Sequence, residues 1–211
     1  MHYILVGPSG SGKTTIASKI AEEFDDIRLT VQWTTRTPRP QEVNGKDYTF
    51  ATDDEFLQMK MKDAFAATSY FEMTTGPVFY GIKHEDVSVS SVPTISVLDP
   101  VMASALLRQG YTVKVIWLDV PSTDLMDDID RRGDAHDEAI RRLTQDLVQF
   151  KHMEDDGLWE YRIAPAEGMD PIKRHEFLYK TVKDIIEGTE EYICLLKNAN
   201  QTHLVSPEEL A

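Results

Sequence analysis

The sequence predicts an α/β protein in which a parallel sheet carries helices on both faces. A short apolar run at residues 2–6 is followed by a glycine-rich turn and by a segment with apolar residues at helical spacing. Two further β-branched runs, at residues 93–99 and 111–120, are each followed by a segment with helix signals. This alternation of strands and helices is typical of three-layer α/β folds.

Helix signals support each of the connecting segments. Residues 100–110 end at a glycine, and residues 121–133 begin with a proline and end at a glycine. Residues 137–153 and 170–188 have the apolar spacing of amphipathic helices. These segments are therefore expected to cover the sheet.

Residues 34–85 interrupt this alternation with short polar strands, turns and one helix that begins near Thr52. We expect one domain of 1–211 whose core is formed by residues 1–33 and 86–121, with residues 34–85 as an insertion. The remaining parts are a lid at about 122–142 and a C-terminal helical part at about 143–211.

Composition and charge exclude several classes of function. The chain has 211 residues, of which 41% are hydrophobic, and a net charge of -14 that would repel a nucleic acid polymer. No apolar run approaches the roughly 20 residues that span a bilayer, so no membrane association is expected. The single cysteine, Cys194, cannot form an internal disulfide, which fits a reducing, cytoplasmic setting. We expect small-molecule partners and either a monomer or a homodimer.

The segment GPSGSGKTT, residues 7–15, matches the P-loop pattern and stands between a strand and a helix. Its glycines let successive backbone N–H groups point at one anion, and the helix N-terminus adds partial positive charge. Lys13 is expected to reach the β and γ phosphates of ATP, and the Thr14 hydroxyl to ligate Mg²⁺. The predicted ATP-binding residues in this loop are Gly7, Ser9, Gly10, Ser11, Gly12, Lys13, Thr14 and Thr15.

An acidic residue at the end of a neighbouring strand would complete the magnesium site. Asp99 is the preferred candidate and Asp119 its competitor. A carboxylate in either place is also explained by capping of the following helix.

The segment WTTRTPRPQEVNGKDYTF, residues 33–50, concentrates phosphate-binding groups. Arg36 and Arg39 can form planar, bidentate contacts with a phosphate, and the neighbouring prolines stiffen the loop. Tyr48 can donate its hydroxyl to the same group. The alternative is that the arginines are surface charges paired with Glu42 or Asp47.

This segment resembles the substrate-binding segment of guanylate kinases, whose pattern is close to T-T-R-x-P-R-x-G-E-x-x-G-x-D-Y-x-F. Gln41 replaces the usual glycine, and together with the P-loop the resemblance extends loosely over residues 1–163. It implies that Arg36, Arg39 and Tyr48 hold the monophosphate of an acceptor nucleotide, with Tyr80 as a further ligand.

The resemblance also covers the lid sequence DRRGDAHDEAIRRL, residues 130–143. Arg132 and Arg142 match arginines that close over the phosphates in these kinases, and the adjacent Arg131 is assigned to ATP binding. The alternative is a solvated helix face.

The positions that read guanine in the family are altered in this chain. Ile82 stands where a serine or threonine is usual, and Ala67 stands where an acidic residue is usual unless an insertion brings Glu72 there. Asp99 is a substrate-binding candidate as well as a metal candidate, and Gln32 replaces a serine. The residues expected to bind phosphate match the family pattern, whereas those expected to contact the base differ from it.

These features together predict a nucleoside monophosphate kinase that transfers the γ-phosphoryl group of ATP to a (d)NMP, with GMP or dGMP preferred. The predicted catalytic residues are Lys13, Arg36, Arg132 and Arg142, and the cofactors are ATP and Mg²⁺. One alternative is a kinase for a different or modified (d)NMP or another small phosphate acceptor. A second alternative is a catalytically inactive, guanylate kinase-like binding module, against which the complete P-loop argues.

Overall fold

The protein is built on a parallel sheet of five strands, ordered β2-β7-β1-β8-β9. The computed structural model describes residues 1–73, 76–88, 92–126 and 136–188. The central strand β1 pairs in parallel with β7 on one side and β8 on the other. The strands are β1 His2–Val6, β2 Arg28–Leu29, β7 Thr94–Val97, β8 Val113–Leu118 and β9 Tyr161–Ile163. The predicted parallel α/β sheet is therefore confirmed.

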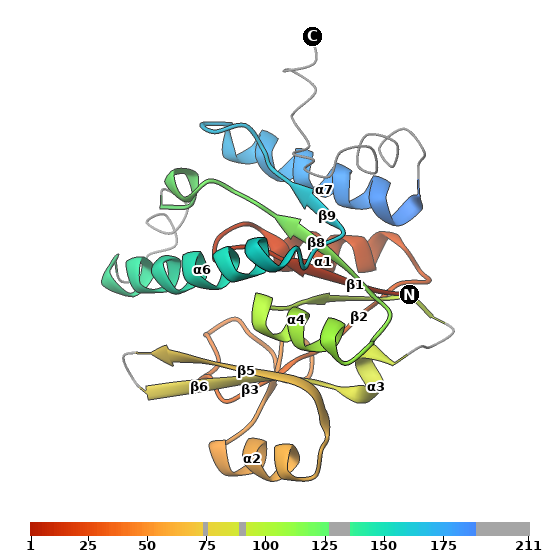
Figure 1. Cartoon of the computed structure of the whole chain (residues 1–211), viewed down its shortest axis with the longest axis vertical. Coiled ribbons are helices and arrows are strands. Elements are labelled where there is room, and N and C mark those ends of the chain that lie inside the picture. The colour runs from red at the N-terminus through yellow and green to blue at the C-terminus, as the bar shows by residue number, and fades with distance from the viewer. Residues whose placement is uncertain (74–75, 89–91, 127–135, 189–211) are drawn as a thin grey trace.

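Helices cover both faces of this sheet, so the core has three layers (Figure 1). On one face, α1 (Lys13–Glu23) and α7 (Pro171–Glu187) contribute apolar side chains to one buried cluster. On the other face, α4 (Pro100–Arg108) and the C-terminal half of α6 (His136–Asp156) contribute to a second cluster. The two clusters together make up the hydrophobic core.

A smaller, four-stranded sheet, ordered β4-β3-β6-β5, forms the lower part of the molecule in Figure 1. Its long antiparallel hairpin consists of β5 (Phe65–Met73) and β6 (Gly76–Lys83). The other elements of this region are β3 Trp33–Thr34, β4 Thr49–Phe50, α2 Asp53–Met61 and α3 His84–Val87. The sheet thus lies within the part of the sequence where an insertion is expected.

Two features of the sequence-based division differ in the structure. The boundary between the expected lid and the C-terminal part, at residue 142, falls inside the continuous helix α6. The short edge strand β2 was not anticipated, because two residues give no periodic signal.

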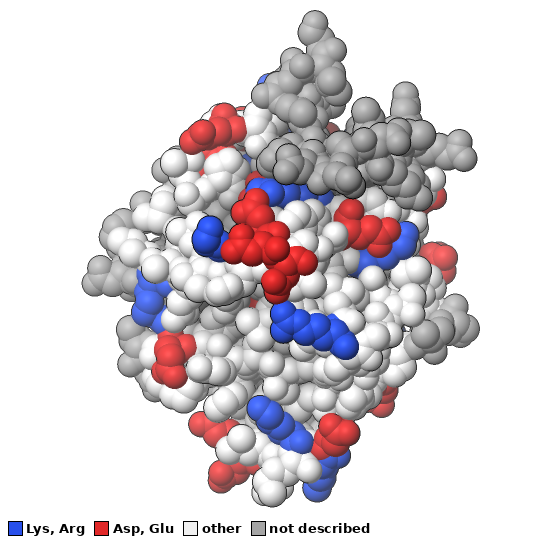
Figure 2. All heavy atoms as spheres, viewed as in Figure 1, with Lys and Arg blue, Asp and Glu red and all other residues white. Residues whose placement is uncertain are grey.

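Charges of both signs are interspersed on the face shown in Figure 2, and no broad basic area appears there. The chain as a whole carries a net charge of -14. In the described part of the chain, none of the helices combines the length and apolarity needed to cross a bilayer.

Helix α2 is attached to the smaller sheet through one fully buried side chain, that of Phe56. Its ring stacks on Phe65, with 4.6 Å between centroids, and lies 5.7 Å from the ring of Phe79. We therefore expect Phe56→Ala to lower the free energy of unfolding by about 3–5 kcal/mol, as measured by denaturant titration. Leu57→Ala on the exposed side of the same helix is the control, and an equal loss in both variants would contradict this account.

Candidate active site

The P-loop connects the end of β1 to the start of α1, where glycines are required by geometry. Gly12 is the N-cap of α1 with φ 85°, and a Cβ there would also lie 3.0 Å from Nδ1 of His175. A Cβ on Gly7 would lie 2.8 Å from the carbonyl oxygen of Leu118. The loop is therefore held close to the sheet in a conformation that directs its N–H groups outward.

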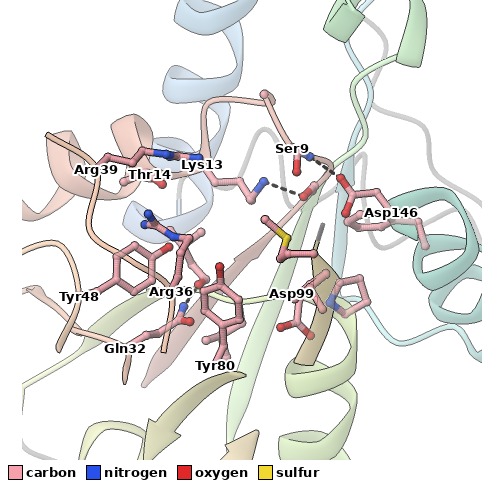
Figure 3. Close-up of a pocket in the computed structure, with 18 residues that line it drawn as sticks. Ser9, Lys13, Thr14, Gln32, Arg36, Arg39, Tyr48, Tyr80, Asp99 and Asp146 are labelled. Carbon is pink, nitrogen blue, oxygen red and sulfur yellow. Dashed lines mark hydrogen bonds between the residues drawn. The ribbon is translucent and has the colours of Figure 1, made fainter. Parts of the chain in front are cut away.

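Lys13 folds back over this loop in the structure (Figure 3). Its Nζ donates to the carbonyl oxygens of Gly7 and Pro8, each at 2.7 Å, and to the Ser11 hydroxyl at 3.3 Å. The ammonium group is thus positioned at the mouth of the loop by acceptors that belong to the loop itself.

Arg36 is the most constrained cation of the insertion. Its Nη2 donates to both carboxylate oxygens of Glu42, at 2.7 and 2.9 Å, and Glu42 also accepts from the backbone N–H of Arg39 at 2.7 Å. Burial by itself would lower the pKa of Arg36, but the hydrogen bonds and charge of Glu42 outweigh it and raise the pKa. The pairing with Glu42 proposed as an alternative is therefore present, and it orients the guanidinium beside the cleft rather than on the open surface.

Two tyrosines stand beside this arginine. The rings of Tyr48 and Tyr80 meet edge to face with centroids 6.1 Å apart, and the Arg36 guanidinium lies 5.3 Å from the Tyr48 ring centre. Burial raises the pKa of Tyr48, so its hydroxyl stays protonated and able to donate near neutral pH.

The P-loop and the insertion face each other across one cleft with a volume of about 240 Å³. Figure 3 shows Lys13 and Thr14 opposite Arg36, Tyr48 and Tyr80. The predicted site residues that line the cleft are Gly7, Ser9, Gly10, Lys13, Thr14, Arg36, Arg39, Tyr48, Tyr80 and Asp99. Gly12 and Thr15 line an adjoining pocket, and Ser11 is buried within the loop.

The two carboxylates considered as metal ligands, Asp99 and Asp119, have different partners within the protein. Asp119 is ion-paired with Arg162 at 2.6 Å, which accounts for its charge. Asp99 caps α4, where its Oδ1 accepts from the Met102 N–H at 3.0 Å, and its Oδ2 accepts from the Ser69 hydroxyl at 2.5 Å. The helix-cap alternative therefore applies to Asp99, which nevertheless lines the cleft.

Several predicted residues are not brought to the cleft. Glu72 is exposed on β5 and lines a separate groove, because the pleat of the strand turns it away from the cleft-facing Phe71 and Met73. Arg131 and Arg132 lie outside the described residues; Arg142 lies on α6 and its side chain is likewise not described.

The positions at which this chain departs from the guanylate kinase pattern pack into the core. Ala67 and Ile82 face each other across β5 and β6, and both belong to the cluster beneath α4. Their exposed fractions are 5% and 0%, and neither lines the cleft. The expectation that Ile82 lines a base pocket is thus not met in this structure.

Sequence reasoning missed Asp146, which lies on α6 and faces the P-loop (Figure 3). Its Oδ2 accepts from the Ser9 N–H at 2.7 Å, and the residue is only 8% exposed. The helix was expected, but periodicity alone does not reveal that this face meets a loop far away in the sequence. One of the P-loop N–H groups that could bind a phosphate is therefore already bound to a carboxylate.

Comparison with known proteins decides the family. A family model described as guanylate kinase matches residues 1–164. This chain belongs to the guanylate kinase family. As a guanylate kinase family member it is a nucleoside monophosphate kinase, a phosphotransferase.

Some relatives of this guanylate kinase family member match over most of the chain, and others match over a shorter segment. The guanylate kinase of Wolbachia pipientis wMel is 40% identical over 198 residues, 92% of this chain and 88% of that protein. That of Chlamydia muridarum is 34% identical over 195 residues, 89% of this chain and 87% of that protein. A match of 53% identity to the guanylate kinase of Geobacter sulfurreducens spans 64 residues, 30% of this chain and 32% of that protein.

A solved structure supports the fold. The crystal structure of guanylate kinase from Anaplasma phagocytophilum aligns with a TM-score of 0.63 at 24% identity, covering 89% of this chain and 85% of that one. At this level of identity the likeness concerns the fold alone.

The contact between Asp146 and the P-loop generates a prediction for this family member. Phosphate oxygens entering the loop must displace the carboxylate and are repelled by its charge, so Asp146→Asn is expected to lower the Kd for ATP by about three- to tenfold. Equilibrium binding by calorimetry measures the change. Asp156→Asn, at the exposed end of the same helix, is the matched control. Unchanged or weaker ATP binding in Asp146→Asn would show that the carboxylate does not oppose the triphosphate.

Proposed function

We propose that the protein transfers the γ-phosphoryl group of ATP to GMP or dGMP. The observation that carries this proposal is the single cleft in which P-loop residues face Arg36, Arg39, Tyr48 and Tyr80. Two phosphate-binding groups on opposite walls are what a transfer between two nucleotides requires.

The donor side fits a triphosphate. Glycines with positive φ at Gly10 and Gly12 shape the loop, and its Ser9 N–H already binds an oxyanion, the carboxylate of Asp146. ATP would take the place of that carboxylate, with Lys13 turning from the loop carbonyls to the β and γ phosphates. Gly7, Gly12, Ser11 and Thr15 complete the donor site in this proposal.

The Thr14 hydroxyl, which is exposed to the cleft, is the proposed protein ligand for Mg²⁺. Bound Mg²⁺ would neutralise charge on the transferring phosphates. Magnesium in such sites keeps several waters and takes few protein ligands, so a single hydroxyl beside the phosphates suits it. Asp99 caps α4 and lines the cleft together with Tyr80 and Phe71, and we assign it to the acceptor nucleotide instead.

The acceptor monophosphate would be held by the insertion. Arg36, fixed by Glu42, keeps N–H groups and charge at the cleft, and Arg39 lines the cleft from the same loop. Tyr48 and Tyr80 donate their hydroxyls to the same phosphate. This arrangement orients one phosphate oxygen for in-line attack on the γ-phosphorus, so that the oxygen–phosphorus bond to the acceptor forms as the bond to ADP breaks.

The transferring group needs further positive charge, which Lys13, Arg36 and the lid arginines Arg132 and Arg142 are proposed to supply. Arg131 is assigned to the donor nucleotide. No covalent enzyme intermediate is needed, because attack passes directly from one bound nucleotide to the other.

Removing the P-loop lysine tests the donor side. Lys13→Ala is expected to lower kcat by at least about two orders of magnitude, because it deletes charge stabilisation of the transferring group. The unfolding midpoint should stay close to that of the unmodified protein, since Lys13 lies at a loop mouth and not in the core. Lys60→Ala on the exposed side of α2 is the control. Near-normal turnover by Lys13→Ala would refute the donor assignment.

Removing the acceptor-side arginines tests the division into two phosphate sites. Arg36→Ala and Arg39→Ala are each expected to raise KM for GMP by about tenfold or more while changing KM for ATP little. Steady-state kinetics with one substrate varied at a time gives both constants. Arg108→Ala, an exposed arginine paired with Asp156 outside the cleft, serves as the control. Equal increases in both KM values would contradict separate sites.

A further inference from the structure

A hydrogen bond between a buried serine and a half-buried aspartate joins the smaller sheet to the core beside the cleft. Ser69, on β5 of the smaller sheet, is 6% exposed, and its hydroxyl donates to Oδ2 of Asp99 at 2.5 Å. The second oxygen of Asp99 accepts from the Met102 N–H in the first turn of α4. The carboxylate is therefore fixed by one donor from the insertion and one from the core.

This contact lies beside the proposed acceptor site. In the β5–β6 hairpin, Ser69 is opposite Tyr80, and the next pair along the same face is Ala67 opposite Ile82. The second pair is apolar and packed in the core, so it offers no hydrogen bond to a ligand. Ser69 and Tyr80 are consequently the first residues with a hydroxyl beyond the apolar pair.

The cleft extends from the phosphate-binding groups to Asp99. Tyr80 and Asp99 line the same cleft, and Phe71 and Pro100 supply apolar surface there. Phe71 meets Tyr80 edge to face, with 5.6 Å between ring centres. A nucleotide whose phosphate contacts Tyr80 can therefore place a planar base against these apolar surfaces, with its edge toward the carboxylate.

The Ser69 hydroxyl also affects the charge of the aspartate. Burial raises the pKa of Asp99, and the hydrogen bonds from Ser69 and from the backbone offset this effect only in part, so the pKa stays above its usual value. An ionised carboxylate only accepts hydrogen bonds. Guanine presents two adjacent donors, N1–H and the 2-amino group, whereas adenine presents an acceptor at N1 and no 2-amino group. In its ionised form the Asp99 carboxylate is therefore complementary to the guanine edge.

We propose that Ser69 is a positioning residue for recognition of the acceptor base, acting by holding the Asp99 carboxylate toward the N–H donors of guanine. This inference rests on the proposed function as a GMP kinase. Capping of α4 alone needs only the oxygen bonded to Met102, so the Ser69 bond adds a second constraint that a cap does not require. Base selection then depends on a hydroxyl–carboxylate pair spanning the two sheets.

The test is a double-mutant cycle with Ser69→Ala, Asp99→Asn and the variant carrying both changes. Each protein is assayed with GMP, with IMP, which keeps N1–H but lacks the 2-amino group, and with AMP. Ser69→Ala is expected to raise KM for GMP by about tenfold, leave KM for ATP within about twofold, and narrow the preference for GMP over AMP. In the Asp99→Asn background, Ser69→Ala should change KM for GMP by less than about twofold, because the carboxylate through which Ser69 acts has been removed.

Ser96→Ala is the matched control, since Ser96 is a fully buried serine that bonds Thr30 and does not line the cleft. If Ser69→Ala raises KM for GMP and ATP equally, or if its effect persists undiminished beside Asp99→Asn, the serine is only a packing residue and the inference fails. Turnover of GMP that is unchanged in Ser69→Ala would overturn this inference while leaving the proposed function intact. Absence of GMP binding and turnover in the unmodified protein would overturn both.

Discussion

The parallel pairing of β1 between β7 and β8 is the constraint on which the site depends. Leu5 is in register with Val97 on one side and with Ile116 on the other, so all three strands end at the same edge of the sheet. The P-loop after β1 and Asp99 after β7 are thereby delivered to one crevice, as expected at the carboxyl edge of an open α/β sheet. The smaller sheet faces that edge, so the loop that carries Arg36 and Arg39 lies opposite the P-loop.

Three polar groups of the cleft are bound to partners within the protein. Lys13 donates to loop carbonyls, Arg36 pairs with Glu42, and the Ser9 N–H is bound by Asp146. Binding of a nucleotide is therefore an exchange of partners, and its net free energy is the difference between two sets of charge-assisted hydrogen bonds. In the proposed complex, the Arg36–Glu42 contact would persist and preorganise the site, whereas phosphate would have to replace Asp146 at the Ser9 N–H, which would weaken binding.

The sequence predicted the parts of the site that are contiguous along the chain. The P-loop and the loop with Arg36 and Arg39 each have their functional residues within one short segment. The strand and helix periodicities around both segments were strong enough to place them in the fold. The sequence did not predict roles for Asp146 and Ser69, because both act through contacts with distant parts of the chain. Asp146 contacts Ser9 at a separation of 137 residues, and Ser69 contacts Asp99 at a separation of 30 residues. Ile82 was misjudged for a related reason: its alignment with a family position does not reveal that the side chain turns into the core.

Recognition of the base and placement of the insertion are physically linked in this arrangement. Ser69 belongs to the smaller sheet and Asp99 to the core, so the hydrogen bond between them helps to fix the position of the smaller sheet relative to the core. In the proposed complex, a base that donates to Asp99 would lie near the apolar side chains of Phe71 on β5 and Pro100 on α4, which line the same cleft. Such a base would meet residues of both walls, whose relative position the bond between Ser69 and Asp99 already helps to fix. Selection of the base and placement of the insertion thus rest on one set of contacts.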